Sequence, residues 1–74
     1  MLKDDELYKL LGNNIRTLRE TKLMTQQTLA DLCNMEKSNL SRIERGQTNI
    51  TIKKLYHIAC GLEITLSDLL TLPH

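Results

Sequence analysis

The 74-residue chain contains no tryptophan and no phenylalanine, and Tyr8 and Tyr56 are its only aromatic residues. Hydrophobic residues nevertheless make up 41% of the sequence, so the core must consist of leucine and isoleucine with a few methionines. This composition favours an all-α fold over a β-sandwich, because strands are enriched in aromatic and β-branched residues. We expect residues 1–74 to form one domain, near the smallest size that folds without help from a partner.

A long apolar run is also absent. No segment approaches the ~20 apolar residues that span a membrane, and the opening segment MLKDDELYKL is acidic where a secretion signal would be basic and then apolar. We therefore expect a cytoplasmic protein that does not contact a membrane. In a reducing compartment, Cys33 and Cys60 are expected to be buried free thiols and not a disulfide.

The residue combinations of an active site are missing as well. The sequence has no evident nucleophile paired with a base, no paired carboxylates and no glycine-rich phosphate loop. His57 and Cys60 are one helical turn apart, which suits metal ligands, but the only obvious third ligand is Cys33, on an apolar helix face. We therefore expect no enzyme activity, no metal and no cofactor.

Apolar residues recur at helical spacing in five segments. The first expected helix has Asp4 or Asp5 as its N-cap and ends near Lys22. The others cover residues 26–33, 37–45 and 52–62, followed by a short helix after Thr65. Thr25 and Thr51 are placed to cap two of them, and TLSD at residues 65–68 matches a capping box. The buried faces are expected to include Leu7, Leu11, Ile15 and Leu18 in the first helix, Leu29, Leu32 and Cys33 in the second, Leu40 and Ile43 in the third, and Ile52, Leu55, Ile58, Ala59 and Leu62 in the fourth.

Two glycines have specific expected roles in this arrangement. Gly12 interrupts the first helix at a cost of about 1 kcal/mol relative to alanine, and we expect another helix to approach closely there. Gly46 is well placed to end the third helix.

Residues 26–43 have the spacing of two short helices that cross at a steep angle. Counting from Gln26, a small residue, Ala30, falls at position five, and Asn34, which tolerates a left-handed conformation, falls at nine. Apolar residues fall at positions four, eight, ten, fifteen and eighteen. Such a crossing needs a small side chain at the contact, a sharp turn and one apolar face on each helix.

This pattern resembles the helix-turn-helix of the Cro/repressor family, also called the xenobiotic-response-element family of bacterial and phage regulators. The segments NNIRTLRETKLMTQQTLAD, SNLSRIERGQTNITIKKLYHIA and LEITLSDLL follow the family's five helices in order. The resemblance implies an all-α, five-helix lambda-repressor-like domain with its helix-turn-helix at about residues 25–45. Within the family, NITIKKLYHIACGLEI is most similar to the controller proteins of restriction-modification systems.

The sequence departs from the family pattern at three positions. Asn34 stands where glycine is usual, which its left-handed tolerance allows. Glu36 occupies the expected N-cap of the third helix, where serine or threonine is usual, and Glu63 stands where glycine often ends the fourth helix. The boundaries of these two helices are therefore open.

The resemblance implies that the third helix enters the major groove of double-stranded DNA. The residues expected to meet base edges are Lys37, Ser38, Ser41 and Arg42, with Glu36 and Asn39 at the margin. The residues expected to contact phosphates are Gln26, Asn39, Arg45, Asn49, Thr51, Lys53 and Lys54, with Arg16 a weaker candidate. Net charge is only +1, but residues 37–54 hold five basic residues and one acid, so a basic face is expected.

Two structural roles also follow from the resemblance. Glu44 is expected to pair with Arg19, which would tie the third helix to the first. A homodimer is expected to place two third helices on a palindromic operator, with an interface drawn from Ile64, Leu66, Leu69, Leu70 and Leu72, although these residues could instead close the monomer core.

An alternative interpretation is an antitoxin or adaptor that uses the same fold mainly to bind a protein. The five helices leave no room for a sensor domain, so no small-molecule ligand is expected. We expect regulation through protein concentration instead.

Overall fold

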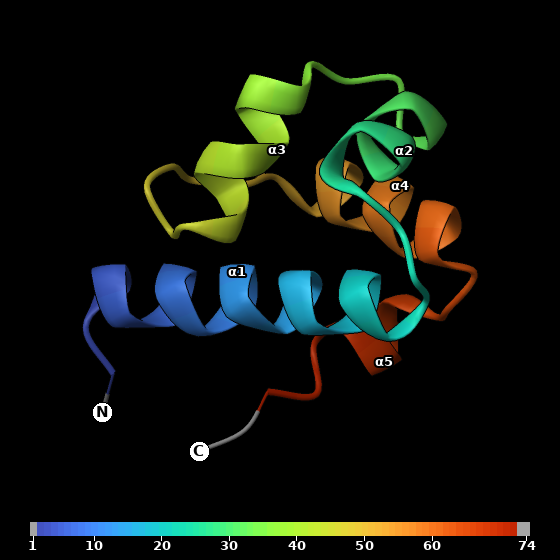
Figure 1. The fold of residues 1–74 in the computed structure, drawn as a ribbon. Helices are drawn as coiled ribbons and strands as arrows, with labels where there is room; N and C mark the ends of the chain where they lie inside the picture. The colour runs from blue at the N-terminus through green and yellow to red at the C-terminus, as the bar shows by residue number, and fades with distance from the viewer. Residues whose placement is uncertain (1, 73–74) are drawn as a thin grey trace.

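The computed structural model describes residues 2–72, which contain five α-helices and no strand (Figure 1). The helices are α1 Asp4–Thr21, α2 Gln26–Leu32, α3 Lys37–Glu44, α4 Ile52–Leu62 and α5 Leu66–Leu69. α1 runs along one side of the molecule, and α3 lies over its N-terminal half. The all-α prediction is confirmed.

Side-chain caps begin three of the helices. The hydroxyl oxygens of Thr25, Thr51 and Thr65 each accept a hydrogen bond from the backbone amide three residues later, at 3.0 to 3.1 Å. Thr65 also belongs to the predicted capping box, because the carboxylate of Asp68 accepts from its amide in return. α1 starts differently from the prediction: Lys3 is its N-cap, and Asp4 and the two acids that follow form its first turn. Acids there interact favourably with the helix dipole.

The C-termini of α1 to α4 share one motif. Each helix is followed by a residue with positive φ, namely Leu23, Asn34, Gly46 and Glu63. The amide of the next residue then donates to the carbonyl five residues back, at 2.9 to 3.1 Å. This is the Schellman arrangement, which satisfies carbonyls that the helix leaves unpaired. Asn34 and Glu63 therefore adopt the left-handed conformation that Gly46 adopts after α3.

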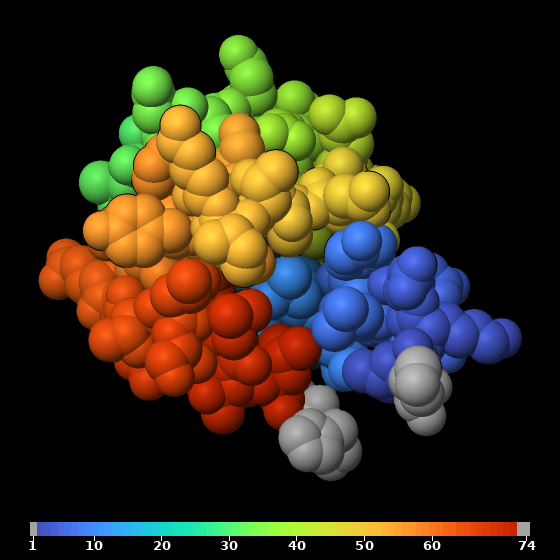
Figure 2. All heavy atoms as spheres, turned by 180° about the vertical axis from the view of Figure 1, so that it is seen from behind, coloured from blue at the N-terminus to red at the C-terminus, as the bar shows by residue number. Residues whose placement is uncertain are grey.

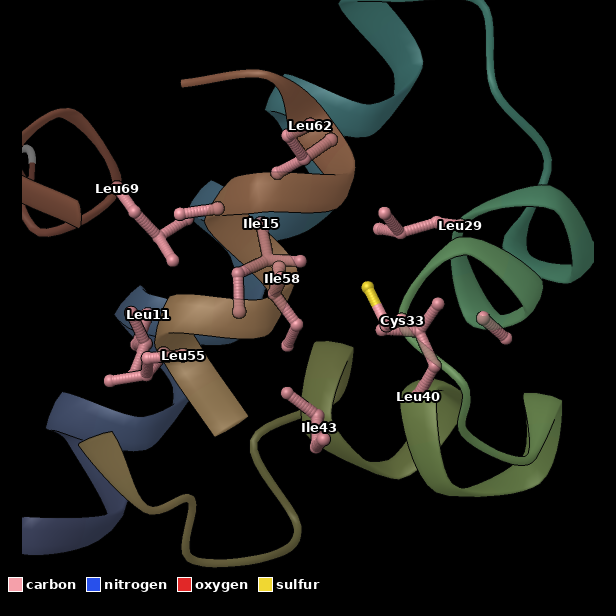
Figure 3. Close-up of a cluster of buried hydrophobic side chains, with 12 residues drawn as sticks. Leu11, Ile15, Leu29, Cys33, Leu40, Ile43, Leu55, Ile58, Leu62 and Leu69 are labelled. Carbon is pink, nitrogen blue, oxygen red and sulfur yellow. The ribbon is translucent and has the colours of Figure 1, made fainter. Parts of the chain in front are cut away.

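The core lies between α1 and the other four helices and takes side chains from all five (Figure 3). The largest of its fully buried side chains are Ile15, Leu29, Leu40, Ile58, Leu62 and Leu69. Their convergence from separate helices explains how so small a domain builds a core without tryptophan or phenylalanine. No helix within residues 2–72 is both long and apolar enough to cross a membrane.

Several predicted core residues are exposed instead. Leu7, Leu32 and Ile52 are 41%, 59% and 63% exposed. Each lies in the first or last turn of its helix, where the neighbouring helices no longer cover the apolar face. The prediction of a buried thiol was also wrong for Cys60, which is exposed. It follows Ile58 by two residues, which places it on the opposite face of α4 from the core.

Gly12 confirms the predicted close approach of a second helix. A Cβ atom added to Gly12 would lie 2.3 Å from the carbonyl oxygen of Ile43 and 2.6 Å from that of Glu44. Both atoms belong to the backbone of α3, so a side chain would force the helices apart. Glycine at this position lets α3 rest directly on α1.

Candidate nucleic-acid interface

α3 is held against the domain by one side only. Leu40 and Ile43 are buried in the core, and Glu44 is only 6% exposed. The three residues fall on one side of a helix that turns about 100° per residue. The remaining side of α3 faces away from α1 in Figure 1 and is open to solvent.

Three of the predicted base-reading residues, Ser38, Ser41 and Arg42, lie on this open side, while Lys37 belongs to the first turn of α3. Lys37, Ser38 and Arg42 are exposed, and Ser41 is partly exposed. Their side chains are hydroxyl, ammonium and guanidinium groups, which can donate hydrogen bonds to acceptors on base edges. Arg45 is exposed on the same side, and its Nε donates to the carbonyl oxygen of Ser41 at 3.3 Å.

A buried ion pair fixes the C-terminal end of α3 to α1. The Nε and Nη2 atoms of Arg19 donate to the two carboxylate oxygens of Glu44 at 2.7 and 3.0 Å. The Nη1 atom of Arg19 also donates to the carbonyl oxygen of Met24, at 2.8 Å. The hydrogen bond to Glu44 raises the pKa of Arg19 above its usual value and outweighs the opposing effect of burial. The guanidinium therefore stays charged, and its two hydrogen bonds to the Glu44 carboxylate form an ion pair inside the domain.

Gln26 joins this ion pair from the first turn of α2. Its Nε2 atom donates to the same Glu44 oxygen that accepts from Nη2 of Arg19, at 3.0 Å. One carboxylate thus connects α1, α2 and α3. The sequence did not predict this bond, because no spacing rule relates residues that are 18 positions apart on different helices.

A hollow of about 260 Å³ lies beside α3 at this network. Gln26, Ser41, Arg45 and Arg16 are among the residues that line it. Arg16 is exposed and forms a 3.5 Å ion pair with Glu20, one turn further along α1. Three of the predicted DNA contacts, together with Arg16, therefore meet on one flank of α3.

A second hollow, of about 430 Å³, is lined by Asn39 and Lys54 together with Asp31 and Glu36. Asn39 and Ser41 are two residues apart, so they point about 160° away from each other around the helix. The two hollows therefore flank α3 on opposite sides. Glu36 does not cap α3 with its side chain, so its carboxylate remains an acidic group at the edge of this surface.

The other predicted phosphate contacts are not all gathered at these hollows. Thr51 and Lys53 are exposed at the start of α4, where the oxygen of Thr51 already accepts from the amide of Lys54. Asn49 lines a separate hollow with Asp4 and other residues near the start of α1. Asn49 is therefore less favourably placed for an anion than Lys54.

This arrangement of five helices agrees with comparisons to known proteins. A family model described as helix-turn-helix matches residues 15–69, which is most of the chain. The chain belongs to the Cro/C1-type (XRE) helix-turn-helix family. The matched residues include the ion pair, both helices of the motif and α4.

Relatives of this helix-turn-helix protein include transcriptional regulators and restriction-modification control proteins. Control protein C.MunI from a Mycoplasma species is 36% identical over 59 residues, covering 78% of this chain and 80% of that protein. The crystal structure of restriction-modification controller protein C.AhdI from Aeromonas hydrophila has a TM-score of 0.80 at 35% identity, covering 85% of this chain and 94% of that chain. The structure of a hypothetical transcription factor, NHTF from Neisseria, has a TM-score of 0.86 at 27% identity, covering 99% of this chain and 84% of that chain. The resemblance to a helix-turn-helix regulator family is thus confirmed.

The C-terminal residues of this family member divide between core and surface. Leu69, predicted at a dimer interface, is completely buried within the monomer, so that assignment was wrong. Its carbonyl oxygen also accepts from Nδ2 of Asn14 at 2.7 Å, which fixes α5 on α1. Leu70 is 42% exposed, and Ile64, Leu66 and Leu72 are partly buried. α4 and α5 lie side by side on the face seen in Figure 2.

Residues 2–72 contain no cluster of three or more histidine, cysteine or acidic side chains arranged to hold a metal ion. Cys33 and His57 are in contact, but through the Sγ atom of Cys33 and the backbone carbonyl of His57, at 3.5 Å.

Proposed function

We propose that this protein is a transcription regulator that recognises a specific sequence of double-stranded DNA by inserting α3 into the major groove. The observation that carries the proposal is the division of α3 into two sides. Leu40, Ile43 and Glu44 anchor one side, while the other presents a row of hydrogen-bond donors to solvent. A helix that is fixed in this way can offer its outer side chains to base edges in a constant orientation.

The base-reading role is assigned to four residues of α3. Arg42 suits guanine, because a guanidinium can bond O6 and N7 together, and Lys37 can reach the same two acceptors. The hydroxyls of Ser38 and Ser41 can donate or accept. Each well-formed bidentate contact discriminates between bases by about 1–3 kcal/mol.

Phosphate contacts on both flanks of α3 would hold it in register. Gln26 and Arg45 line one hollow, while Asn39 and Lys54 line the other. The remaining candidates are Asn49, Thr51 and Lys53, in or just before the first turn of α4. Contacts of this kind supply much of the affinity and make it depend strongly on salt.

We infer that the protein acts as a homodimer on a palindromic operator. One α3 reads only a few base pairs, and a twofold axis would place a second copy about 34 Å away, one helical turn along the DNA. Leu70 is the exposed leucine of the C-terminal region, and Ile64, Leu66 and Leu72 leave part of their surface uncovered nearby in sequence. These four residues are the proposed interface.

Selection of bound duplexes from a random pool tests the function most directly. The expected consensus is a palindrome whose half-sites lie about 10 base pairs apart. The double variant Lys37→Ala with Arg42→Ala should lose the site preference. The matched control is Lys3→Ala with Lys9→Ala, which removes the same charge from the exposed first turns of α1. Absence of any consensus for the wild-type protein at low salt would refute the proposal and favour a protein-binding adaptor.

A further inference from the structure

The carboxylate of Glu44 accepts more hydrogen bonds than an ion pair with Arg19 requires. Its Oε2 atom accepts from Nε of Arg19 at 2.7 Å, and Oε1 accepts from Nη2 of Arg19 and from Nε2 of Gln26, both at 3.0 Å. An ionised carboxylate can only accept hydrogen bonds. The amide nitrogen of Gln26, and not its oxygen, must therefore face Glu44.

This constraint decides which group Gln26 offers to its surroundings. An amide nitrogen carries two hydrogens, and Glu44 takes one of them. Gln26 is only partly buried, at the hollow that Ser41 and Arg45 also line. The second N–H is thus held at the flank of α3. A glutamine without this bond could turn its carbonyl oxygen to the same place, where it would repel a phosphate oxygen.

The charge of Glu44 does not oppose a phosphate at this hollow. Its side chain is only 2% exposed, and the guanidinium of Arg19 neutralises it through two hydrogen bonds. Arg45 adds positive charge at the hollow, where Arg16 is paired with Glu20, an acid that also lines it. An acid can therefore orient a phosphate ligand here without adding repulsion.

We propose that Glu44 is a positioning residue for DNA binding: its buried carboxylate fixes the amide of Gln26 so that the free N–H donates to a backbone phosphate beside α3. This inference rests on the proposed DNA-binding function. It gives the buried ion pair a second role, in which the same contacts that attach α3 to the domain also orient a phosphate ligand on α2.

Gln27 provides a matched control. It also lies in the first turn of α2, but its Nε2 atom donates to Asp31 at 2.8 Å, along its own helix and on an exposed surface. Replacement of Gln27 therefore changes the same residue type in the same turn without touching the Glu44 network.

A double-mutant cycle on DNA affinity tests the coupling. Gln26→Met is made in the wild type and in a background with Arg19→Met and Glu44→Met, because replacing both partners of a buried ion pair by apolar residues is often tolerated. In the wild type, Gln26→Met should weaken binding to the selected duplex about tenfold or more, as for a hydrogen bond to a charged group. In the apolar background the same change should reduce affinity for the duplex by less than about threefold. Gln27→Met should have equal, small effects in both.

Equal losses from Gln26→Met in the two backgrounds would overturn the positioning role while leaving the DNA-binding function intact. A wild-type protein without any site preference would instead refute the function itself. Circular dichroism and urea titration of each variant establish that it is folded before its affinity is compared.

A second measurement uses the wild-type protein free in solution, so it does not depend on any variant being folded. The side-chain NH₂ group of Gln26 should show restricted motion in ¹⁵N relaxation, whereas that of the exposed Gln47 should be mobile. Equal mobility of the two groups would overturn the proposal.

Discussion

Replacing Glu44 by alanine should destabilise the domain severely. The change removes the acceptor for two hydrogen bonds from Arg19 and one from Gln26. The Arg19 side chain would remain only 10% exposed, with its positive charge unpaired. Removing one partner of a buried ion pair typically costs about 3–5 kcal/mol, because the other charge loses its partner at a site with little access to water.

That loss is large relative to the stability of so small a domain. At about 0.05–0.15 kcal/mol per residue, a chain of this length has a free energy of unfolding of roughly 4–11 kcal/mol. For domains of this size, 1 kcal/mol corresponds to about 4–8 °C in Tm. Glu44→Ala should therefore lower Tm by at least about 12 °C, and it could leave the chain largely unfolded at 37 °C.

Thermal and urea unfolding followed by circular dichroism at 222 nm measure this effect. Glu20→Ala is the control, because Glu20 pairs with Arg16 at 3.5 Å on the surface and should contribute no more than about 0.5 kcal/mol. The paired change Arg19→Met with Glu44→Met should be milder than Glu44→Ala alone, because it leaves no unpaired charge. A loss below about 1 kcal/mol for Glu44→Ala would refute the reasoning from burial.

Three further predictions concern the glycines, a helix end and the thiols. Gly12→Ala should lower the free energy of unfolding by about 1–3 kcal/mol, because the added Cβ atom would meet backbone oxygens of α3. Asn13→Ala, on the exposed side of α1, is the control and should leave the free energy of unfolding in urea unchanged or slightly higher. Glu63→Gly should stabilise by up to about 1 kcal/mol, since glycine accepts the left-handed conformation without steric cost, and a loss of stability would contradict this. Iodoacetamide labelling followed by mass spectrometry should modify Cys60 at least about tenfold faster than Cys33, whose burial raises its pKa and limits access, and equal rates would contradict the assigned burial.

The parts of the fold that the sequence predicted are those specified by local chemistry. Thr25, Thr51 and Thr65 act as caps because each hydroxyl oxygen can accept a hydrogen bond from the amide three residues later. That amide lies in the first turn and has no acceptor within its own helix. Gly12 was informative because a glycine inside a helix costs stability unless a close contact requires it. Asn34 adopts the predicted left-handed conformation, which its short polar side chain tolerates.

The errors arose where tertiary packing decides the outcome. The helical period places Leu32 and Ile52 near the apolar faces, but it cannot indicate where a neighbouring helix stops covering them. Leu69 was assigned to a dimer interface because a leucine-rich final helix has two possible uses, and only the packing of α5 shows that the core takes this residue. The bond from Gln26 to Glu44 had no signal in the sequence at all.

The interior contacts and the proposed base contacts place independent demands on α3. Leu40, Ile43 and Glu44 determine how the helix lies on α1 and α2, and none of them faces solvent. Lys37 and Arg42 are exposed, so exchanging either residue should cost little packing energy. Such exchanges would therefore alter the proposed base contacts while leaving the fold unchanged. Under the proposed function, the exposed residues of α3 would determine which operator is recognised, and the buried carboxylate of Glu44 would add to DNA affinity by orienting Gln26.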